Sequence, residues 1–280
     1  MTLLQILLLA VVQGLAEMLP VSSSAHVILA QKLMGLNPGS PEMTFLLVML
    51  HTGTMLGALL YFGKRWKNQN FHFYKMLVLA TACTGFLGLA LKVGIEKVLL
   101  EHILHHTKGE VENLFGNLFI IGSALLAAGT LILWSSKHEA RAKDATLTPR
   151  QSIWIGLVQG LCLPFRGFSR SGATISTGMT TGVSRSLAEE FSFALAVALT
   201  PAAIALETRR LFKSMHEQAG TFDLAHAMTP GLIGMVFSFV GALIALKWLS
   251  SWLEKGRWHY FGFYCVAFAC VVLAAAFAGV

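Results

Sequence analysis

Six runs of apolar residues divide the chain into segments that are each long enough to cross a lipid bilayer. They cover residues 43–62, 76–94, 113–134, 187–207, 229–250 and 260–279. A transmembrane helix needs about 20 consecutive, predominantly apolar residues. The pattern therefore predicts an all-α integral membrane protein with six membrane-spanning helices.

Two further apolar stretches, 2–34 and 152–183, are interrupted by polar residues and prolines. The first contains Glu17, Pro20 and the run Ser22–Ser24, and the second contains Pro164, Arg166, Gly167 and Arg170. Each half of each stretch is about 12 residues, which is too short to cross a bilayer alone. The interruptions predict two re-entrant helical hairpins, each turning at mid-depth and leaving on the side where it entered.

Composition supports the membrane assignment. The chain has 280 residues, of which 55% are hydrophobic and 12% are charged, whereas soluble domains carry about 25% charged residues. We therefore expect residues 1–280 to form a single membrane domain. The net charge of +7 lies in short clusters between apolar segments, which is typical of loops facing membrane lipids and argues against binding to nucleic acid.

The distribution of Lys and Arg predicts the orientation. If six spans alternate and both hairpins return to their own side, one side holds loops 63–75, 135–151, 184–186 and 247–258. These loops contain twelve basic residues, the opposite side contains seven, and Arg166 and Arg170 belong to the second hairpin. Cytoplasmic loops carry the excess of positive charge. Both termini should then face outward, with the first hairpin entering from outside and the second from inside.

A weak internal similarity suggests two related halves, roughly 1–134 and 152–280. VVQGL at 11–15 matches LVQGL at 157–161, and FLLVMLHTGTMLGALL at 45–60 aligns with FALAVALTPAAIAL at 193–206. Halves of opposite orientation are typical of inverted-topology repeats, whose sites lie near the bilayer midplane. Chance similarity among apolar segments is the alternative explanation.

Arg170 lies in an apolar environment and needs a partner of opposite charge. An arginine at mid-membrane costs at least about 2.5–3.5 kcal/mol. Glu17 is the obvious candidate, because it is one of only two acidic residues among the first 62. The sequence therefore predicts that Glu17 and Arg170 share one pocket.

Both interruptions are rich in groups that bind phosphate. Gln13 lies one helical turn before Glu17, and the two interruptions supply hydroxyls, an imidazole and a glycine that leaves room for a ligand: Ser22, Ser23, Ser24, His26, Ser169, Ser171, Thr174 and Gly172. New helices should start after each interruption and offer free N–H groups. The set suits phosphate or pyrophosphate, and a serine beside a histidine and a carboxylate can act as a nucleophile. The alternatives are structural: serines that join helices, a buried histidine, and a purely structural ion pair.

The motifs GLAEMLPVSSSAH and GFSRSGATIS resemble those of the bacitracin-resistance (BacA/UppP) family of undecaprenyl-pyrophosphate phosphatases, and the resemblance covers nearly the whole chain. It implies an enzyme of the bacterial cytoplasmic (inner) membrane that hydrolyses undecaprenyl pyrophosphate to undecaprenyl phosphate and inorganic phosphate. This reaction recycles the lipid carrier for cell-wall synthesis. A divalent cation, Mg²⁺ or Ca²⁺, is implied as cofactor, and the polyprenyl pyrophosphate and membrane lipids as partners.

The matching positions give the expected site. The expected catalytic residues are Glu17, Ser23, His26 and Arg170, with Glu17 also as the metal ligand. The expected substrate-binding residues are Gln13, Ser22, Ser169, Ser171, Gly172 and Thr174. Two positions depart from the family pattern. Gln13 stands where many members have a first glutamate, which leaves a metal site built on two carboxylates unsettled, and Arg166 stands near a position that is often proline.

The mechanism we expect from the sequence leaves several roles open. Arg170 clamps the pyrophosphate, Ser23 attacks phosphorus or positions a water, His26 acts as general base, and Glu17 orients His26 or holds the metal. The pocket should open toward the periplasmic side. A membrane transporter or flippase for a lipid phosphate or anion would use similar groups, and phosphate release separates the two functions. The sequence is also compatible with a homodimer.

Two other histidine-containing segments stand apart from these motifs. His51, in HTGT, is a plausible residue of the site because ionisable groups inside membranes are often functional. The segment EHILHH at 101–106 has metal-like spacing but offers no third ligand with convincing placement. We expect it to be a solvated loop.

Overall fold

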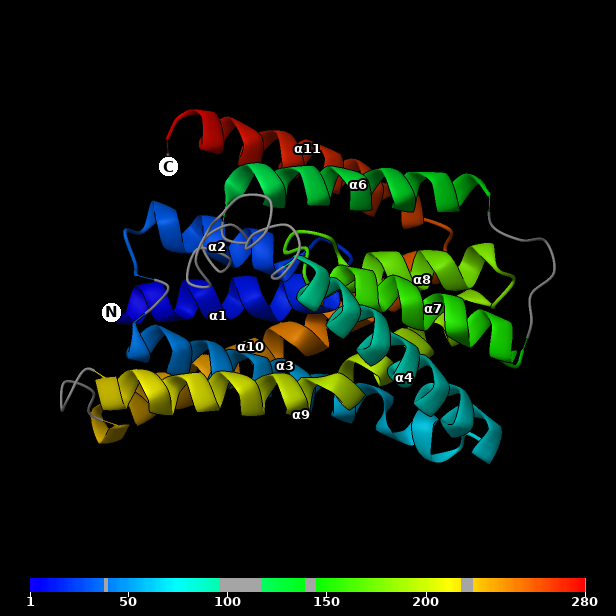
Figure 1. Cartoon of the computed structure of the whole chain (residues 1–280), viewed down its shortest axis with the longest axis horizontal. Coiled ribbons are helices and arrows are strands. Elements are labelled where there is room, and N and C mark those ends of the chain that lie inside the picture. Colours follow the sequence, from blue (N-terminus) through cyan, green and yellow to red (C-terminus); the bar gives the residue numbers. More distant parts are fainter. Residues whose placement is uncertain (38–39, 96–116, 139–144, 218–223, 280) are drawn as a thin grey trace.

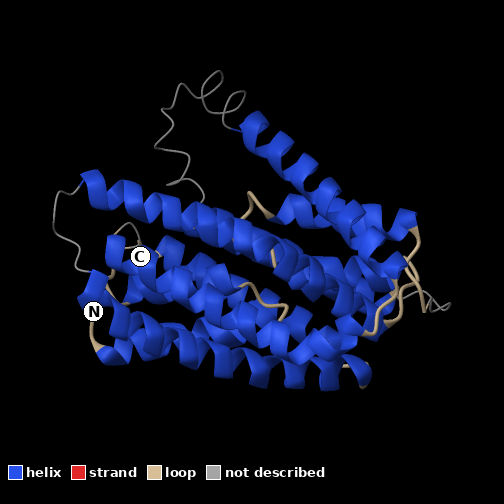
Figure 2. Ribbon diagram, turned by 90° about the horizontal axis from the view of Figure 1, so that it is seen from below, coloured by secondary structure: helices blue, strands red, loops and turns tan. Residues whose placement is uncertain are grey.

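The structure is a computed structural model that describes residues 1–37, 40–95, 117–138, 145–217 and 224–279. All regular elements in these ranges are helices, and most of them lie roughly along one long axis (Figures 1 and 2). The EHILHH segment lies outside the described residues. The predicted all-α class is confirmed.

Six long helices contain apolar segments that are long enough to cross a membrane. They are α3 (Pro41–Lys67), α4 (Phe71–Val93), α6 (Leu118–Lys137), α9 (Arg185–Glu217), α10 (Leu224–Glu254) and α11 (Trp258–Phe277). Each coincides with one predicted span, although α9 extends ten residues beyond the predicted end at 207. The chain is therefore a multi-pass membrane protein, as its apolar pattern predicts.

Local sequence signals set where several of these helices begin. The side chains of Ser40, Asn70 and Asn117 each accept a hydrogen bond from a backbone N–H in the first turn of α3, α4 and α6. Such caps satisfy donors that have no partner within the helix. Short polar residues between apolar runs thus mark the helix starts.

The two interrupted stretches form pairs of short helices. Residues 2–34 give α1 (Leu3–Met18) and α2 (Ser23–Leu33), and residues 152–183 give α7 (Pro149–Cys162) and α8 (Arg170–Thr180). The helices of each pair pack against each other. In Figure 1 the α1–α2 hairpin runs from the left end to the centre and back, whereas the α7–α8 hairpin does so from the right end. Their re-entry into a bilayer and the inverted-repeat relationship stay predictions.

The long helices hold the hairpins in place. α10 packs against α1 and α3, α4 packs against α7, and α8 contacts both α6 and α9. A buried cluster fixes α8: the Ser135 hydroxyl of α6 donates to Ser176 of α8 at 2.8 Å, and the Trp258 indole N–H of α11 lies 3.1 and 3.2 Å from the two hydroxyl oxygens. These bonds hold the helix whose first residue is Arg170.

Candidate active site

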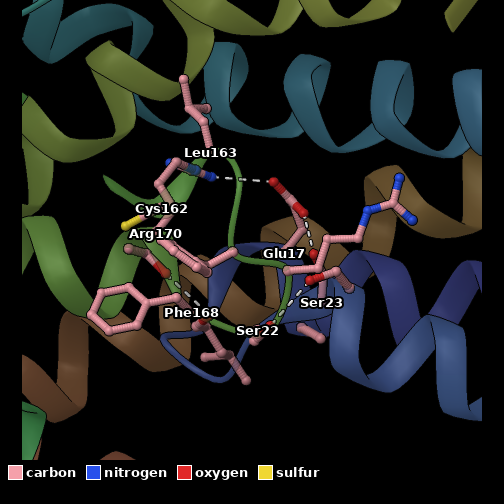
Figure 3. Close-up of a pocket in the computed structure, with 13 residues that line it drawn as sticks. Glu17, Ser22, Ser23, Cys162, Leu163, Phe168 and Arg170 are labelled. Atoms are coloured by element: carbon pink, nitrogen blue, oxygen red, sulfur yellow. Dashed lines mark hydrogen bonds and ion pairs between the residues drawn. The ribbon is translucent and has the colours of Figure 1, made fainter. Parts of the chain in front are cut away.

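A cavity of about 220 Å³ opens where the turns of the two hairpins meet (Figure 3). Residues from the end of α1, the start of α2, the end of α7 and the start of α8 contribute to it. Its lining consists of Ala16, Glu17, Leu19, Ser22, Ser23, Ser24, Cys162, Leu163, Phe165, Arg166, Phe168, Arg170 and Ser171. The cavity therefore combines both of the polar interruptions that the sequence singles out.

Glu17 and Arg170 form an ion pair across the two hairpins. Arg170 Nη2 lies 3.2 Å from Glu17 Oε1, and the two side chains are 21% and 20% exposed. The predicted pairing of these residues is confirmed. The second guanidinium nitrogen of Arg170, Nη1, is buried and has no hydrogen-bond partner among the residues that the structure describes. An unpaired buried donor is costly, so this nitrogen is available to a bound anion.

The hydroxyl of Ser23 is joined directly to the same carboxylate. Ser23 Oγ donates to Glu17 Oε2 at 2.5 Å, and the Gln13 side-chain N–H groups donate to that oxygen at 3.3 Å. Figure 3 shows Ser23 and Arg170 on opposite sides of Glu17. A serine hydroxyl bonded to a carboxylate has a proton acceptor already in place.

The turn before α2 has an unusual backbone conformation. Ser22 has φ of 65° and is the only non-glycine residue with positive φ among the described residues. It occupies the N-cap position of α2, yet its side chain makes no capping hydrogen bond. Positive φ is uncommon outside glycine and concentrates at functional sites. The N-terminus of α2 therefore keeps N–H groups free of a side-chain cap beside the cavity.

A direct contact joins the two turns. The backbone N–H of Gly167 donates to Ser24 Oγ at 3.2 Å. Gly167 has φ of +101°, and a Cβ atom there would lie 2.3 Å from the carbonyl oxygen of Ile121. Only glycine fits this position, because the conformation and the close approach to α6 both exclude a side chain. The contact fixes the second turn against the serine run.

The remaining residues of the second motif mainly support α8. Ser171 lines the cavity and donates to the carbonyl oxygen of Leu19 at 3.2 Å. Ser169 caps α8 by accepting from the N–H of Gly172 at 3.2 Å, and the Thr174 hydroxyl lies 2.6 Å from that of Ser192. Ser169, Gly172 and Thr174 are not part of the cavity lining, and the space expected beside Gly172 is taken by Ile132.

His26 does not contact Ser23 or Glu17 through any hydrogen bond of the structure. Its Nδ1 lies 2.8 Å from the carbonyl oxygen of Ser22, and its Nε2 lies 2.7 Å from the Tyr264 hydroxyl. The ring also stacks on Phe268, with centroids 3.9 Å apart. Because a carbonyl oxygen only accepts, Nδ1 carries a proton, and Nε2 is engaged by the tyrosine. Both nitrogens of His26 are thus engaged by groups other than Ser23 and Glu17.

Several residues of the site carry no signal in the sequence. Tyr264 and Phe268 come from α11, more than 230 residues from His26, and Leu163, Phe165 and Phe168 look like ordinary membrane residues. His51 is not part of the cavity lining, and its Nδ1 lies 2.8 Å from the Leu47 carbonyl oxygen. Its role in the site stays a prediction.

The number of carboxylates at the cavity limits which metal ion the site can bind. Within the described ranges, no cluster of three or more His, Cys, Asp or Glu residues has the geometry of a metal site. Among the residues that the structure describes, Glu17 is the only carboxylate that lines the cavity, and both of its oxygens accept hydrogen bonds. Ca²⁺ usually needs six to eight oxygen ligands, whereas Mg²⁺ is often held by one or two carboxylates together with substrate phosphates. The residues fit a cation held mainly by a substrate.

Comparison with known proteins identifies the family of the chain. The family described as Bacitracin resistance protein BacA matches residues 6–271. Undecaprenyl-diphosphatase 2 of Acinetobacter baylyi is 53% identical, with 99% of each chain covered. Undecaprenyl-diphosphatase 1 of Burkholderia pseudomallei is 33% identical over 95% of this chain and 94% of its own. The Undecaprenyl-diphosphatase of Bdellovibrio bacteriovorus is 29% identical over 100% and 98%. The chain belongs to the BacA family of bacitracin resistance proteins.

Proposed function

We propose that this protein hydrolyses undecaprenyl diphosphate to undecaprenyl phosphate and inorganic phosphate, and so recycles the lipid carrier for cell-wall synthesis. The observation that carries the proposal is the direct linkage of Ser23, Glu17 and Arg170 in one cavity. This linkage supports a mechanism in which Ser23 is the nucleophile, Glu17 accepts its proton and Arg170 binds the anion. The names of the relatives agree with the assignment.

The size and lining of the cavity suit the head group of such a lipid and not its tail. Sites for drug-sized ligands typically measure about 300–1,000 Å³, and this cavity measures about 220 Å³. The diphosphate enters it, and the prenyl chain lies along the apolar outer surface. Arg170 Nη1 and the N-terminus of α2 supply donors to phosphate oxygens.

The contacts favour Glu17 as the base that activates Ser23. Ser23 Oγ attacks the terminal phosphorus, its proton passes to Glu17 Oε2, and the bond between that phosphorus and the bridging oxygen breaks. The products of this step are a phosphoserine and undecaprenyl phosphate. The leaving group is a phosphate monoester, whose second pKa is about 6, so it leaves as an anion without a general acid. A water molecule then attacks the phosphorus of the phosphoserine, and the bond from that phosphorus to Ser23 Oγ breaks. Ser23 Oγ takes back the proton held by Glu17, and the water oxygen leaves as part of inorganic phosphate while its surplus proton passes to phosphate or solvent.

His26 has a positioning role in this mechanism. Its bonds to the Ser22 carbonyl oxygen and to Tyr264 connect the strained turn before α2 to α11. The ring therefore holds the turn that presents Ser23 to Glu17. This account replaces the expectation that His26 removes the proton of Ser23.

A divalent cation, Mg²⁺ or Ca²⁺, fits as an ion bound together with the substrate. Glu17 would be its protein ligand, and the diphosphate oxygens would supply most of the others. Such an ion neutralises part of the charge of the diphosphate. A site with two glutamates would have a second carboxylate at position 13, where this chain has glutamine. We therefore expect little cation binding before the substrate binds.

We place the enzyme in the bacterial inner membrane with the cavity open toward the periplasm. The excess of basic residues in loops 63–75, 135–151, 184–186 and 247–258 supports a cytoplasmic location for that side. The α1–α2 hairpin then reaches the cavity from the periplasmic side. A homodimer is compatible with this arrangement and is tested by the molecular mass of the purified protein in detergent.

Phosphate release in detergent tests the proposal. The purified protein should release inorganic phosphate from undecaprenyl diphosphate, and Ser23→Ala should release none above background. A lipid-phosphate carrier or flippase would move its ligand in vesicles without releasing phosphate. Absence of phosphate release by the folded, unsubstituted protein, with and without Mg²⁺ or Ca²⁺, would refute the proposed reaction.

A further inference from the structure

Arg166 is a second cation of the cavity that the proposed reaction does not use. It lies in the turn between α7 and α8, lines the cavity and is exposed. No hydrogen bond or ion pair joins its guanidinium to any residue that the structure describes. Arg170, by contrast, is already paired with Glu17. The two arginines therefore differ in what they offer a ligand.

The net charge of the lining depends on Arg166. The charged residues that line the cavity are Glu17, Arg166 and Arg170. The Glu17–Arg170 pair is neutral, so the surplus positive charge of the lining belongs to Arg166. A diphosphate carries more negative charge than a phosphate monoester, which itself carries about −1.5 to −2 at neutral pH.

The backbone around Arg166 is fixed although its side chain is free. The N–H of Phe168 donates to the carbonyl oxygen of Phe165 at 3.1 Å, and the N–H of Gly167 donates to Ser24 at 3.2 Å. These two bonds hold the turn tightly and connect it to the serine run of the first hairpin. Arg166 thus projects from a rigid base at a defined place on the cavity wall.

The order of groups along the lipid decides which phosphate Arg166 contacts. The terminal phosphate is farthest from the prenyl chain and reaches the partly buried Ser23 and Arg170. The proximal phosphate, which stays on the lipid, lies nearer the exposed part of the lining, where Arg166 is found. Arginine binds phosphate oxygens through several N–H groups at once.

We propose that Arg166 binds the proximal phosphate of the lipid diphosphate and makes the cavity selective for a diphosphate over a less charged head group. This inference rests on the proposed function for the identity of the substrate. The contact is exposed and therefore sensitive to salt. The contact with Arg166 contributes mainly to substrate binding, because the reacting terminal phosphate lies at Ser23 and Arg170.

Kinetics of charge variants test this role. Arg166→Gln should raise KM for undecaprenyl diphosphate in neutral detergent about tenfold, as expected for a charge-assisted contact, and change kcat less than about threefold. Added NaCl should weaken the unsubstituted enzyme more than Arg166→Gln. Arg166→Lys keeps the charge and should retain most of the salt dependence. Arg257→Gln removes an exposed charge away from the cavity and should behave as the unsubstituted enzyme.

Binding of inorganic pyrophosphate separates this inference from the proposed function. Pyrophosphate should raise the thermal unfolding midpoint of the unsubstituted protein more than that of Arg166→Gln. An unsubstituted protein that binds pyrophosphate through Arg166 but releases no phosphate from the lipid would refute the reaction and leave the contact standing. An active enzyme whose Arg166→Gln variant keeps its KM, salt dependence and pyrophosphate response would overturn the contact.

Discussion

The two hairpins share a sequence pattern but contribute different groups to the site. In each, a buried glutamine precedes a glycine that packs closely on a long helix: a Cβ atom on Gly14 would lie 2.6 Å from the Ser238 carbonyl oxygen, and one on Gly160 would lie 2.9 Å from that of Thr84. Four residues after the glutamine, the first hairpin has Glu17 and the second has Leu163. The same backbone pattern therefore carries a carboxylate in the first hairpin and an apolar side chain in the second.

The two hairpins also differ in how their second helices, α2 and α8, begin. Ser169 caps α8 in the ordinary way and places Arg170 at its first position. Ser22 has positive φ, leaves α2 uncapped, and places Ser23 against Glu17. The regular turn holds the cation, whereas the strained turn holds Ser23, the proposed nucleophile. Backbone strain is concentrated at functional sites, which supports this assignment of Ser23.

The largest expected effect concerns the strained turn. Ser23→Ala should lower kcat by at least about 10⁴-fold, because removing a nucleophile leaves only binding and charge stabilisation. Ser24→Ala is the matched variant, since Ser24 lines the same cavity but makes no bond to Glu17. It should lose far less activity. Phosphate release by the two variants measures the difference, and equal losses would show that Ser23 has no special role.

An intermediate effect separates the two candidate bases. If His26 removed the proton of Ser23, His26→Gln would lose about 10²–10⁴-fold in kcat. Because its nitrogens are bonded to Ser22 and Tyr264, we expect a loss below about tenfold and a similar loss for Tyr264→Phe. A full loss in His26→Gln together with normal activity in Tyr264→Phe would restore His26 as the base.

The smallest expected effects compare the two glutamines. Gln13→Leu removes a hydrogen bond to the Glu17 carboxylate and should lower kcat/KM only about threefold, with little change in stability. Gln159 is fully buried, its Nε2 makes only a long hydrogen bond to the Thr84 hydroxyl at 3.4 Å, and its Oε1 has no partner among the described residues. Gln159→Leu should therefore keep activity and raise the free energy of unfolding by about 1 kcal/mol. Thermal unfolding in detergent and phosphate release test both variants. A loss of activity in Gln159→Leu with full activity in Gln13→Leu would contradict the comparison.

The long helices and the central ion pair were predictable from the sequence, because burying polar or charged groups in lipid is costly. Apolar runs of sufficient length identify the six long helices, because lipid leaves few other conformations for the chain. The Glu17–Arg170 pair is predictable for a related reason, since an unpaired charge in an apolar environment is too costly. Both predictions rest on penalties that hold wherever the residues lie in the fold.

The surroundings of several site residues depend on tertiary packing and could not be predicted from the sequence. The partner of His26 is Tyr264 on α11, and nothing near His26 in the sequence indicates that α11 packs beside α2. Gly172 was expected to make room for a ligand, but Ile132 of α6 occupies that space. Arg166 stood out as a charge in an apolar stretch, yet only the structure shows that it lines the cavity and has no partner among the described residues. Each case depends on contacts between distant segments.

A double-mutant cycle tests most directly whether the carboxylate of the first hairpin and the guanidinium of the second act as one unit. Glu17→Gln and Arg170→Ala should each lower kcat/KM for undecaprenyl diphosphate by about 10³-fold, a loss typical of removing a preorganised charge. Their coupling predicts that the double variant loses little more than the worse single variant. Losses that multiply to about 10⁶-fold would mean that the two residues act independently, and the account of a shared site would be wrong.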